Sequence, residues 1–98
     1  NYGNLSFNRA SAKVHVDGAE IDLPRRELSI LDLLLSHKGQ TLSKGQIADQ
    51  ICSLDDTDEL PSDNAIELYI ARLRKKISPS SVRIKTLRGI GYMIYVEQ

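Results

Sequence analysis

The chain has little cysteine and no long apolar run, and each shortage excludes a class of protein. Cys52 is the single cysteine among 98 residues, so an internal disulfide is impossible. No apolar run approaches the roughly 20 residues that a membrane-spanning helix needs. His15 and His37 lie far apart and far from Cys52, which argues against a metal site. What remains is the composition of a globular domain, and we expect it to hold neither a metal nor another cofactor.

The length fits a single domain with a modest hydrophobic core, spanning residues 1–98. The chain begins at Asn1 rather than at an initiator Met. We therefore expect it to be a fragment of a longer protein.

The charges balance in number but not in position. The chain holds 13 basic and 13 acidic side chains. Residues 1–59 carry six basic and ten acidic side chains, a net charge of −4, and residues 60–98 carry seven and three, a net charge of +4. The basic excess is sharpest in "RLRKK", residues 72–76. A local basic patch of this kind is a typical electrostatic footprint for binding a polyanion.

The first part of the chain predicts short strands followed by a helix. Alternating apolar residues predict strands within residues 5–23, with Asp17-Gly18 as a hairpin turn. Pro24 suits the first turn of a helix. The helix should run to about Gly39, because leucines recur at helical spacing at Leu28, Leu31, Leu34 and Leu35.

Two further helices are predicted, with a polar loop at residues 53–61 between them. Ser43 and Gln46 form a capping box at the start of the second helix. The third helix begins at Ser62 or Asp63 and ends at Ile77. At about 100° per residue, one stripe of this helix is apolar and should face the core: Ile66, Ile70, Leu73 and Ile77. The opposite face is polar and partly basic, and carries Asn64, Glu67, Leu68, Ala71, Arg72 and Lys75.

The segment "TLRGIGY", residues 86–92, contains two glycines that could cradle a phosphate or turn a hairpin. A phosphate-binding glycine loop opens a helix, whose N-terminal amides hold the anion. Here the residues after Gly91 alternate like a strand instead. The pattern therefore predicts a hairpin that is turned by Gly89 and Gly91 and presents Arg88 at its end.

Strands, three helices and a C-terminal hairpin resemble the winged helix of OmpR/PhoB-type response regulators. The matching segments are "LPRRELSILDLLLSHKG", "TLSKGQI", "NAIELYIARLRKKI" and "IKTLRGIGYMI". The resemblance implies an α+β fold: a winged helix-turn-helix with an N-terminal antiparallel sheet, three helices and a C-terminal β-hairpin wing. Pro24 departs from the family, which usually has Ser or Thr there, so we expect no side-chain cap on the first helix.

The resemblance implies sequence-specific binding of double-stranded DNA, with the helix at 62–77 in the major groove. The residues that it assigns to base edges are Asn64, Leu68, Tyr69, Ala71 and Arg72. It assigns phosphate contacts to Lys44, Arg74, Lys75, Lys76 and Thr86, and Arg88 of the wing to the minor groove. Arg72 is the strongest base-reading candidate, since arginine can bond to O6 and N7 of guanine together.

Several of these residues have a second interpretation. Arg72 could form a salt bridge with Glu27 or Glu67, and Arg74 could pair with Glu27 rather than with phosphate. Tyr69 could be core packing at the edge of the apolar stripe. The lysines could serve only solubility, and Arg88 could pair with a nearby acid.

The resemblance also implies partners. The family's domains follow a phosphorylatable receiver domain, which we expect upstream in a bacterial cytoplasmic two-component regulator. They bind direct repeats head to tail, so we expect a monomer that pairs only on DNA. The acidic loop with Asp55, Asp56, Asp58 and Glu59 corresponds to a segment that can touch RNA polymerase; alternatively it is a solvated loop kept off the DNA.

Two other classes of function stay open at this point. One is a winged helix that binds only proteins. The other is a small enzyme, although the sequence contains no Ser-His-Asp set, metal cluster or carboxylate pair that could be placed in an active site.

Overall fold

The computed structural model describes residues 2–55 and 60–97 and has the predicted order of elements. Three strands come first, then three helices, then a hairpin: β1 (Leu5–Asn8), β2 (Lys13–Val16), β3 (Ala19–Ile21), α1 (Arg25–Ser36), α2 (Lys44–Asp55), α3 (Asp63–Ile77), β4 (Val82–Leu87) and β5 (Gly91–Val96). The α+β winged-helix prediction is therefore confirmed. None of the helices in the described residues is long and apolar enough to cross a membrane.

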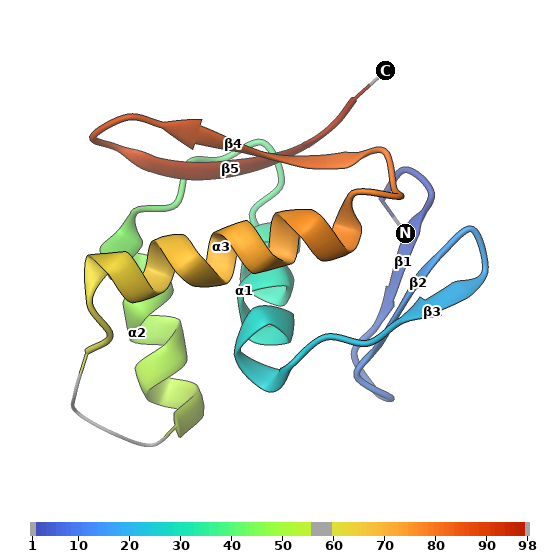
Figure 1. The fold of residues 1–98 in the computed structure, drawn as a ribbon, viewed down its shortest axis with the longest axis horizontal. Helices are drawn as coiled ribbons and strands as arrows, with labels where there is room; N and C mark the ends of the chain where they lie inside the picture. The colour runs from blue at the N-terminus through green and yellow to red at the C-terminus, as the bar shows by residue number, and fades with distance from the viewer. Residues whose placement is uncertain (1, 56–59, 98) are drawn as a thin grey trace.

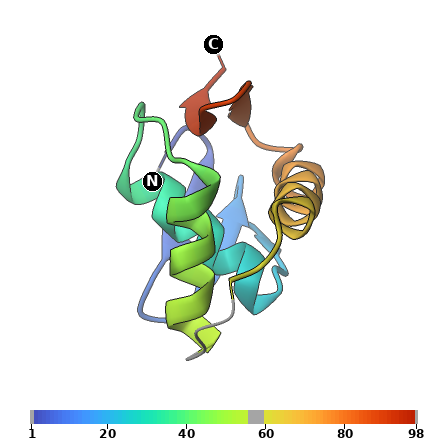
Figure 2. The same cartoon turned by 90° about the vertical axis from the view of Figure 1, so that its left-hand side faces the viewer.

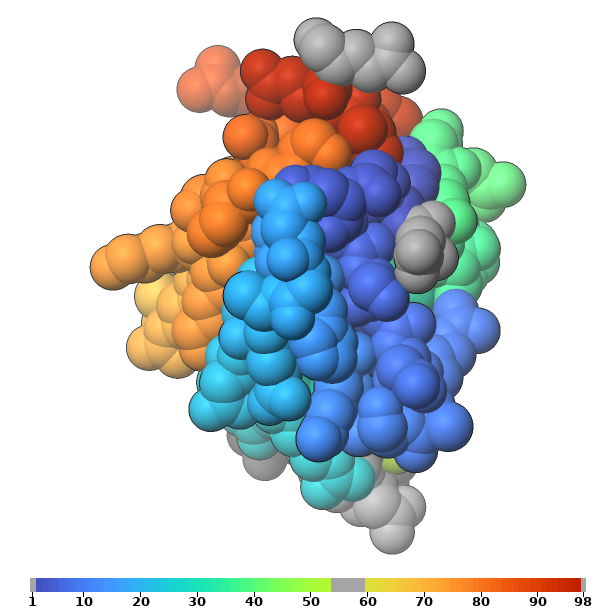
Figure 3. Space-filling view, turned by 90° about the vertical axis from the view of Figure 1, so that its right-hand side faces the viewer, coloured from blue at the N-terminus to red at the C-terminus, as the bar shows by residue number. Residues whose placement is uncertain are grey.

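The elements surround α1, and α3 lies on one outer face. In Figure 1, α3 crosses the front of the molecule, α1 lies behind it and the hairpin β4–β5 runs along the upper edge. Figure 2 shows α3 nearly end-on at the edge of the molecule, with α2 toward the viewer. The N-terminal strands cover the end of the molecule away from α2 (Figure 3). The N-terminal sheet thus lies on the opposite side of the molecule from α2.

The N-terminal sheet is antiparallel in the order β1-β2-β3. Asp17 and Gly18 form its second turn and both have positive φ, 51° and 84°. Two such residues make the type I′ turn that suits a tight hairpin. The hairpin signal read from the sequence is confirmed.

Each helix begins as the sequence indicates. Pro24 is the N-cap of α1 and makes no side-chain cap hydrogen bond, as expected. The capping box of α2 is formed: the Ser43 amide donates to Gln46 Oε1 at 2.8 Å, and the Gln46 amide donates to Ser43 Oγ at 3.1 Å. The Ala65 amide donates to Oγ of Ser62, which caps α3 at 3.1 Å.

The second helix is longer than predicted. It continues to Asp55, whereas the sequence favoured a polar loop from Ser53. Propagation of an existing helix adds one hydrogen bond for each residue fixed, and no glycine or proline interrupts residues 46–55.

One core holds the helices and the hairpin together. The predicted stripe of α3 is buried, with Ile66, Ile70, Leu73 and Ile77 at most 1% exposed. The buried face of α1 is centred on Ile30, Leu31 and Leu34, so two of the four leucines that recur at helical spacing lie in the core. Leu28 and Leu35 are half-buried at its flanks, because neighbouring elements cover α1 on several sides.

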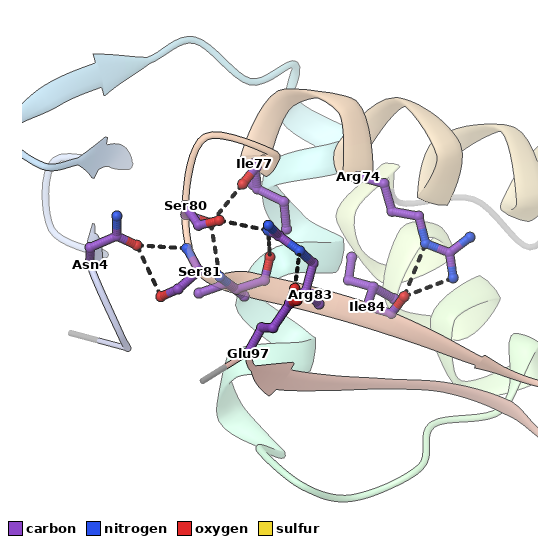
Figure 4. A network of polar contacts seen from close by, with 9 residues as sticks. Asn4, Arg74, Ile77, Ser80, Ser81, Arg83, Ile84 and Glu97 are labelled. Atoms are coloured by element: carbon purple, nitrogen blue, oxygen red, sulfur yellow. Dashed lines mark hydrogen bonds and ion pairs between the residues drawn. The ribbon is translucent and has the colours of Figure 1, made fainter.

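Polar contacts fix the corner between α3 and β4 (Figure 4). Ser80 is buried; its hydroxyl donates to the Ile77 carbonyl at 2.6 Å and accepts from the Val82 amide at 3.1 Å. Asn4 Oδ1 accepts from the Ser81 amide at 2.8 Å. The chain therefore turns sharply from the end of α3 into the hairpin, which runs back along the helix.

The two glycines of the hairpin have different roles. Gly89, with φ 73°, lies in the turn, where the Ile90 amide donates to the Leu87 carbonyl at 2.9 Å. Gly91 is the first residue of β5, so its prediction as a turn residue is corrected. A Cβ on Gly91 would lie 2.0 Å from the Leu42 carbonyl oxygen. The missing side chain lets β5 approach the segment before α2, where Leu42 and Tyr92 exchange two backbone hydrogen bonds of 2.8 Å.

We predict that Gly91→Ala lowers the free energy of unfolding by roughly 3 kcal/mol or more, because overpacking and backbone strain each cost about 1–3 kcal/mol. Gly89→Ala is the matched control: φ is also positive, but a Cβ there meets nothing within 4 Å. It should cost only about 1–2 kcal/mol. Urea unfolding measures both changes, and equal losses would contradict the assigned role of Gly91.

Candidate nucleic-acid interface

The outward face of α3 is exposed along its whole length. Its exposed residues are Asn64, Glu67, Leu68, Ala71, Arg72 and Lys75. Leu68 is 49% exposed although it is apolar. Because the buried stripe holds the helix from behind, this face can enter a groove without disturbing the core.

The hairpin places its turn beside the beginning of α3. A hollow of about 590 Å³ lies between them, lined in part by Lys44, Glu67, Thr86, Arg88 and Tyr92. Arg88 and Ile90 of the turn are exposed. The turn itself lies at the left of Figure 1, above the N-terminal end of α3. Tyr92 and Ile94 of β5 are buried and belong to the core.

Arg74 ties α3 to the hairpin. Its guanidinium donates two hydrogen bonds to the Ile84 carbonyl, from Nε at 3.1 Å and from Nη2 at 2.9 Å (Figure 4). It also donates to the Thr86 hydroxyl and lies 6.0 Å from the centroid of the Tyr92 ring. Of the two roles considered for Arg74, pairing with Glu27 is replaced by a contact with β4, and Arg74 also holds the hydroxyl of the exposed Thr86.

Lys76, rather than Arg74, is the basic residue of α3 that lies beside Glu27. Its Nζ lies 3.8 Å from Glu27 Oε1. Glu27 is 3% exposed, and its Oε1 has no hydrogen-bond partner among the described residues. A buried carboxylate needs a nearby positive charge, and Lys76 supplies it. This lysine is held at the α1 side of the helix.

Lys44, the first residue of α2, pairs with Glu67 near the start of α3. Its Nζ donates to Oε1 of Glu67 at 2.8 Å. This hydrogen bond raises the pKa of Lys44 above its ordinary value. Lys44 is therefore protonated at neutral pH, and it lies on the same side of the molecule as the exposed face of α3.

Residues 18–94 match the family of C-terminal domains of transcriptional regulatory proteins. The chain belongs to this family. A probable transcriptional regulatory protein, y4xI of Sinorhizobium fredii, is 41% identical over 95 residues, which are 95% of this chain and 41% of that protein.

Two solved structures of similar fold support this family assignment. DrrB of Thermotoga maritima, an OmpR/PhoB homologue, is 28% identical, with a TM-score of 0.81 over 97% of this chain and 43% of that one. The RstA DNA-binding domain of Klebsiella pneumoniae, solved in complex with the RstA box, is 24% identical, with a TM-score of 0.83 over 97% of this chain and 94% of that one.

As a transcriptional regulator C-terminal domain, the chain spans about two fifths of the length of its curated relatives. The family is not an enzyme family, so the small-enzyme interpretation left open by the sequence is excluded. In the part of the chain that the structure describes, no three His, Cys, Asp or Glu side chains are grouped to hold a metal ion.

Tyr69 and the acidic loop are two further predicted contact sites. Tyr69 is half-buried at the edge of the stripe, and its hydroxyl accepts from Arg26 Nη1 at 2.7 Å. This placement favours the packing interpretation over base contact. Of the acidic loop, Asp55 ends α2, and Asp56, Asp58 and Glu59 lie outside the described residues.

We predict that Arg74→Lys lowers the free energy of unfolding by about 1–2 kcal/mol, because lysine keeps the charge but cannot reproduce the two-nitrogen contact with the Ile84 carbonyl. Arg72→Lys, on the exposed face of the same helix, should change it by no more than about 0.5 kcal/mol. Thermal unfolding of the two variants compares them. An Arg74→Lys protein as stable as the wild type would show that this contact does not hold the hairpin.

Proposed function

We propose that this domain binds double-stranded DNA sequence-specifically, as the output domain of a two-component transcriptional regulator. In this proposal α3 enters the major groove and Arg88 of the wing enters the adjacent minor groove. Membership of the family and the shared winged-helix fold support DNA binding. The exposed face of α3, with the exposed turn of the hairpin beside it, supports the assignment of grooves and residues.

The observation that carries the proposal is the division of α3 into a buried apolar stripe and an exposed, partly basic face. An α-helix is about 10–12 Å wide with its side chains, and the major groove of B-DNA is about 12 Å wide. Small residues such as Ala71 allow close approach. The exposed wing beside the helix can then reach the neighbouring groove.

Different residues would read bases and hold phosphates. Arg72 suits guanine, Asn64 suits adenine, and Leu68 with Ala71 suits a thymine methyl group. Phosphate contacts fall to Lys75 and Lys44, which would fix orientation more than sequence. Arg74, Thr86 and Lys76, also predicted to hold phosphates, make contacts within the domain, and we expect them to position the helix and wing more than to bind DNA.

The remaining partners follow from the family resemblance. We propose that a receiver domain precedes this domain in a bacterial cytoplasmic protein, and that two copies bind direct repeats about one helical turn, roughly 10–10.5 bp, apart. The isolated domain should be a monomer in solution. The acidic loop after α2 is the proposed contact with RNA polymerase.

Titration of duplex DNA over a salt series tests the proposal. With about four cations at the DNA, namely Lys44, Arg72, Lys75 and Arg88, the log–log slope should be about −3 to −4 per domain. Arg72→Ala should lose roughly 1–3 kcal/mol of discrimination at one base pair, whereas Lys75→Ala should weaken all duplexes alike. A wild-type affinity independent of salt would contradict DNA binding, and equal losses on specific and random duplexes would make Arg72 a phosphate contact.

Arg88 should add affinity and a mild preference for A·T-rich flanks. A narrow A·T minor groove has an enhanced negative potential that attracts arginine, without identifying a unique base. We predict that Arg88→Ala loses this preference on sites that differ only in the flanks. Arg83→Ala is the control, since Arg83 is held by Glu97 at 2.9 Å at the other end of the hairpin. Persistence of the wild-type A·T preference in Arg88→Ala would exclude the minor-groove role.

A further inference from the structure

Glu67 places a negative charge on the face of α3 that is proposed to meet DNA. It lies one turn into the helix, between Asn64 and Ala71 on the exposed side, and its side chain is 53% exposed. A carboxylate near phosphates weakens binding unless a positive charge or a hydrogen-bond donor compensates it. We therefore look for a compensating group beside Glu67.

Lys44 supplies the positive charge. The ammonium group bonds to Oε1 of Glu67 at 2.8 Å and fixes the carboxylate on the flank of α3 that faces α2 and the wing. A carboxylate has a second oxygen, Oε2, that can accept from a ligand. Lys44 has three donor hydrogens, so it can hold Glu67 and a phosphate together.

The major groove offers few partners for a carboxylate. Guanine presents two acceptors there, and thymine presents an acceptor and a methyl group. Neither base can therefore donate a hydrogen bond to a carboxylate. Adenine combines its amino donor with the N7 acceptor. Cytosine presents its N4 amino group without an adjacent acceptor on the same base, and is the base that Glu and Asp suit best.

We propose that Glu67 is a specificity-determining residue that accepts a hydrogen bond from the N4 amino group of a cytosine, with Lys44 as the residue that positions it. This inference rests on the proposed entry of α3 into the major groove. At about 100° per residue, Glu67 and Arg72 lie about 140° apart around α3, so they should read different base pairs.

Selection from a pool of random duplexes, followed by sequencing, tests the proposal with the wild type, Glu67→Gln and Lys44→Met. The wild type should prefer cytosine at one position by roughly 5-fold or more. Glutamine can bond to N6 and N7 of adenine together, so Glu67→Gln should shift that position from cytosine toward adenine and leave the Arg72 position unchanged. Lys44→Met should weaken both total affinity and the cytosine preference.

Asp63→Asn is the matched control, because it removes the same charge from the first turn of α3 and should leave the base profile unchanged. Thermal unfolding checks that each variant is folded. An unchanged base profile in Glu67→Gln, whatever its affinity, would overturn the proposal and leave Glu67 as a partner that only orients Lys44. Failure of the wild type to bind any duplex would instead overturn the proposed function, and this inference with it.

Discussion

The position of the hairpin against the helices depends on the close approach of β5 to the segment before α2. Leu42 and Tyr92 exchange two backbone hydrogen bonds, and Gly91 allows this because a Cβ would collide with the Leu42 carbonyl. On its other edge, β4 receives the Arg74 guanidinium at the carbonyl of Ile84. Because β4 has no further strand on this side, the Ile84 carbonyl would otherwise have no strand partner for a hydrogen bond. The hairpin is thus held from both sides, and the wing and α3 act as one surface of fixed shape.

The same contacts sort the basic residues of α3 and the wing turn into two groups. Arg74 and Lys76 direct their charges into the protein, toward β4 and the buried Glu27 respectively. Arg72, Lys75 and Arg88 are exposed and lie where a nucleic acid could meet them. The run "RLRKK" therefore divides between residues that attach α3 to the rest of the domain and residues that stay exposed for the proposed contact with DNA. The overall charge of zero is consistent with this division, since only a local patch has to face the polyanion.

Local patterns were sufficient to predict most of the fold. The apolar stripe of α3, the Ser43–Gln46 capping box and the Asp17-Gly18 turn each depend on residues close in sequence, and each is confirmed. Apart from the longer α2, the errors concern partners distant in sequence. Gly91 faces the backbone of Leu42 and Arg74 faces a backbone carbonyl, and neither partner leaves a side-chain signal in the sequence. Glu67 lay on the predicted outward face, but its pairing with Lys44 became visible only once α2 and α3 were placed together.

The central claim is that α3 occupies the major groove while the wing occupies the next minor groove. Methylation interference on a selected binding site tests it most directly, since dimethyl sulfate modifies guanine N7 in the major groove and adenine N3 in the minor groove. The account predicts interference by guanine N7 methylation in the segment under α3. It also predicts interference by adenine N3 methylation about half a helical turn away, roughly 5 bp, and loss of this second signal in Arg88→Ala. Interference confined to adenine N3, or none from guanine N7 on a site that contains guanine, would contradict the placement of α3.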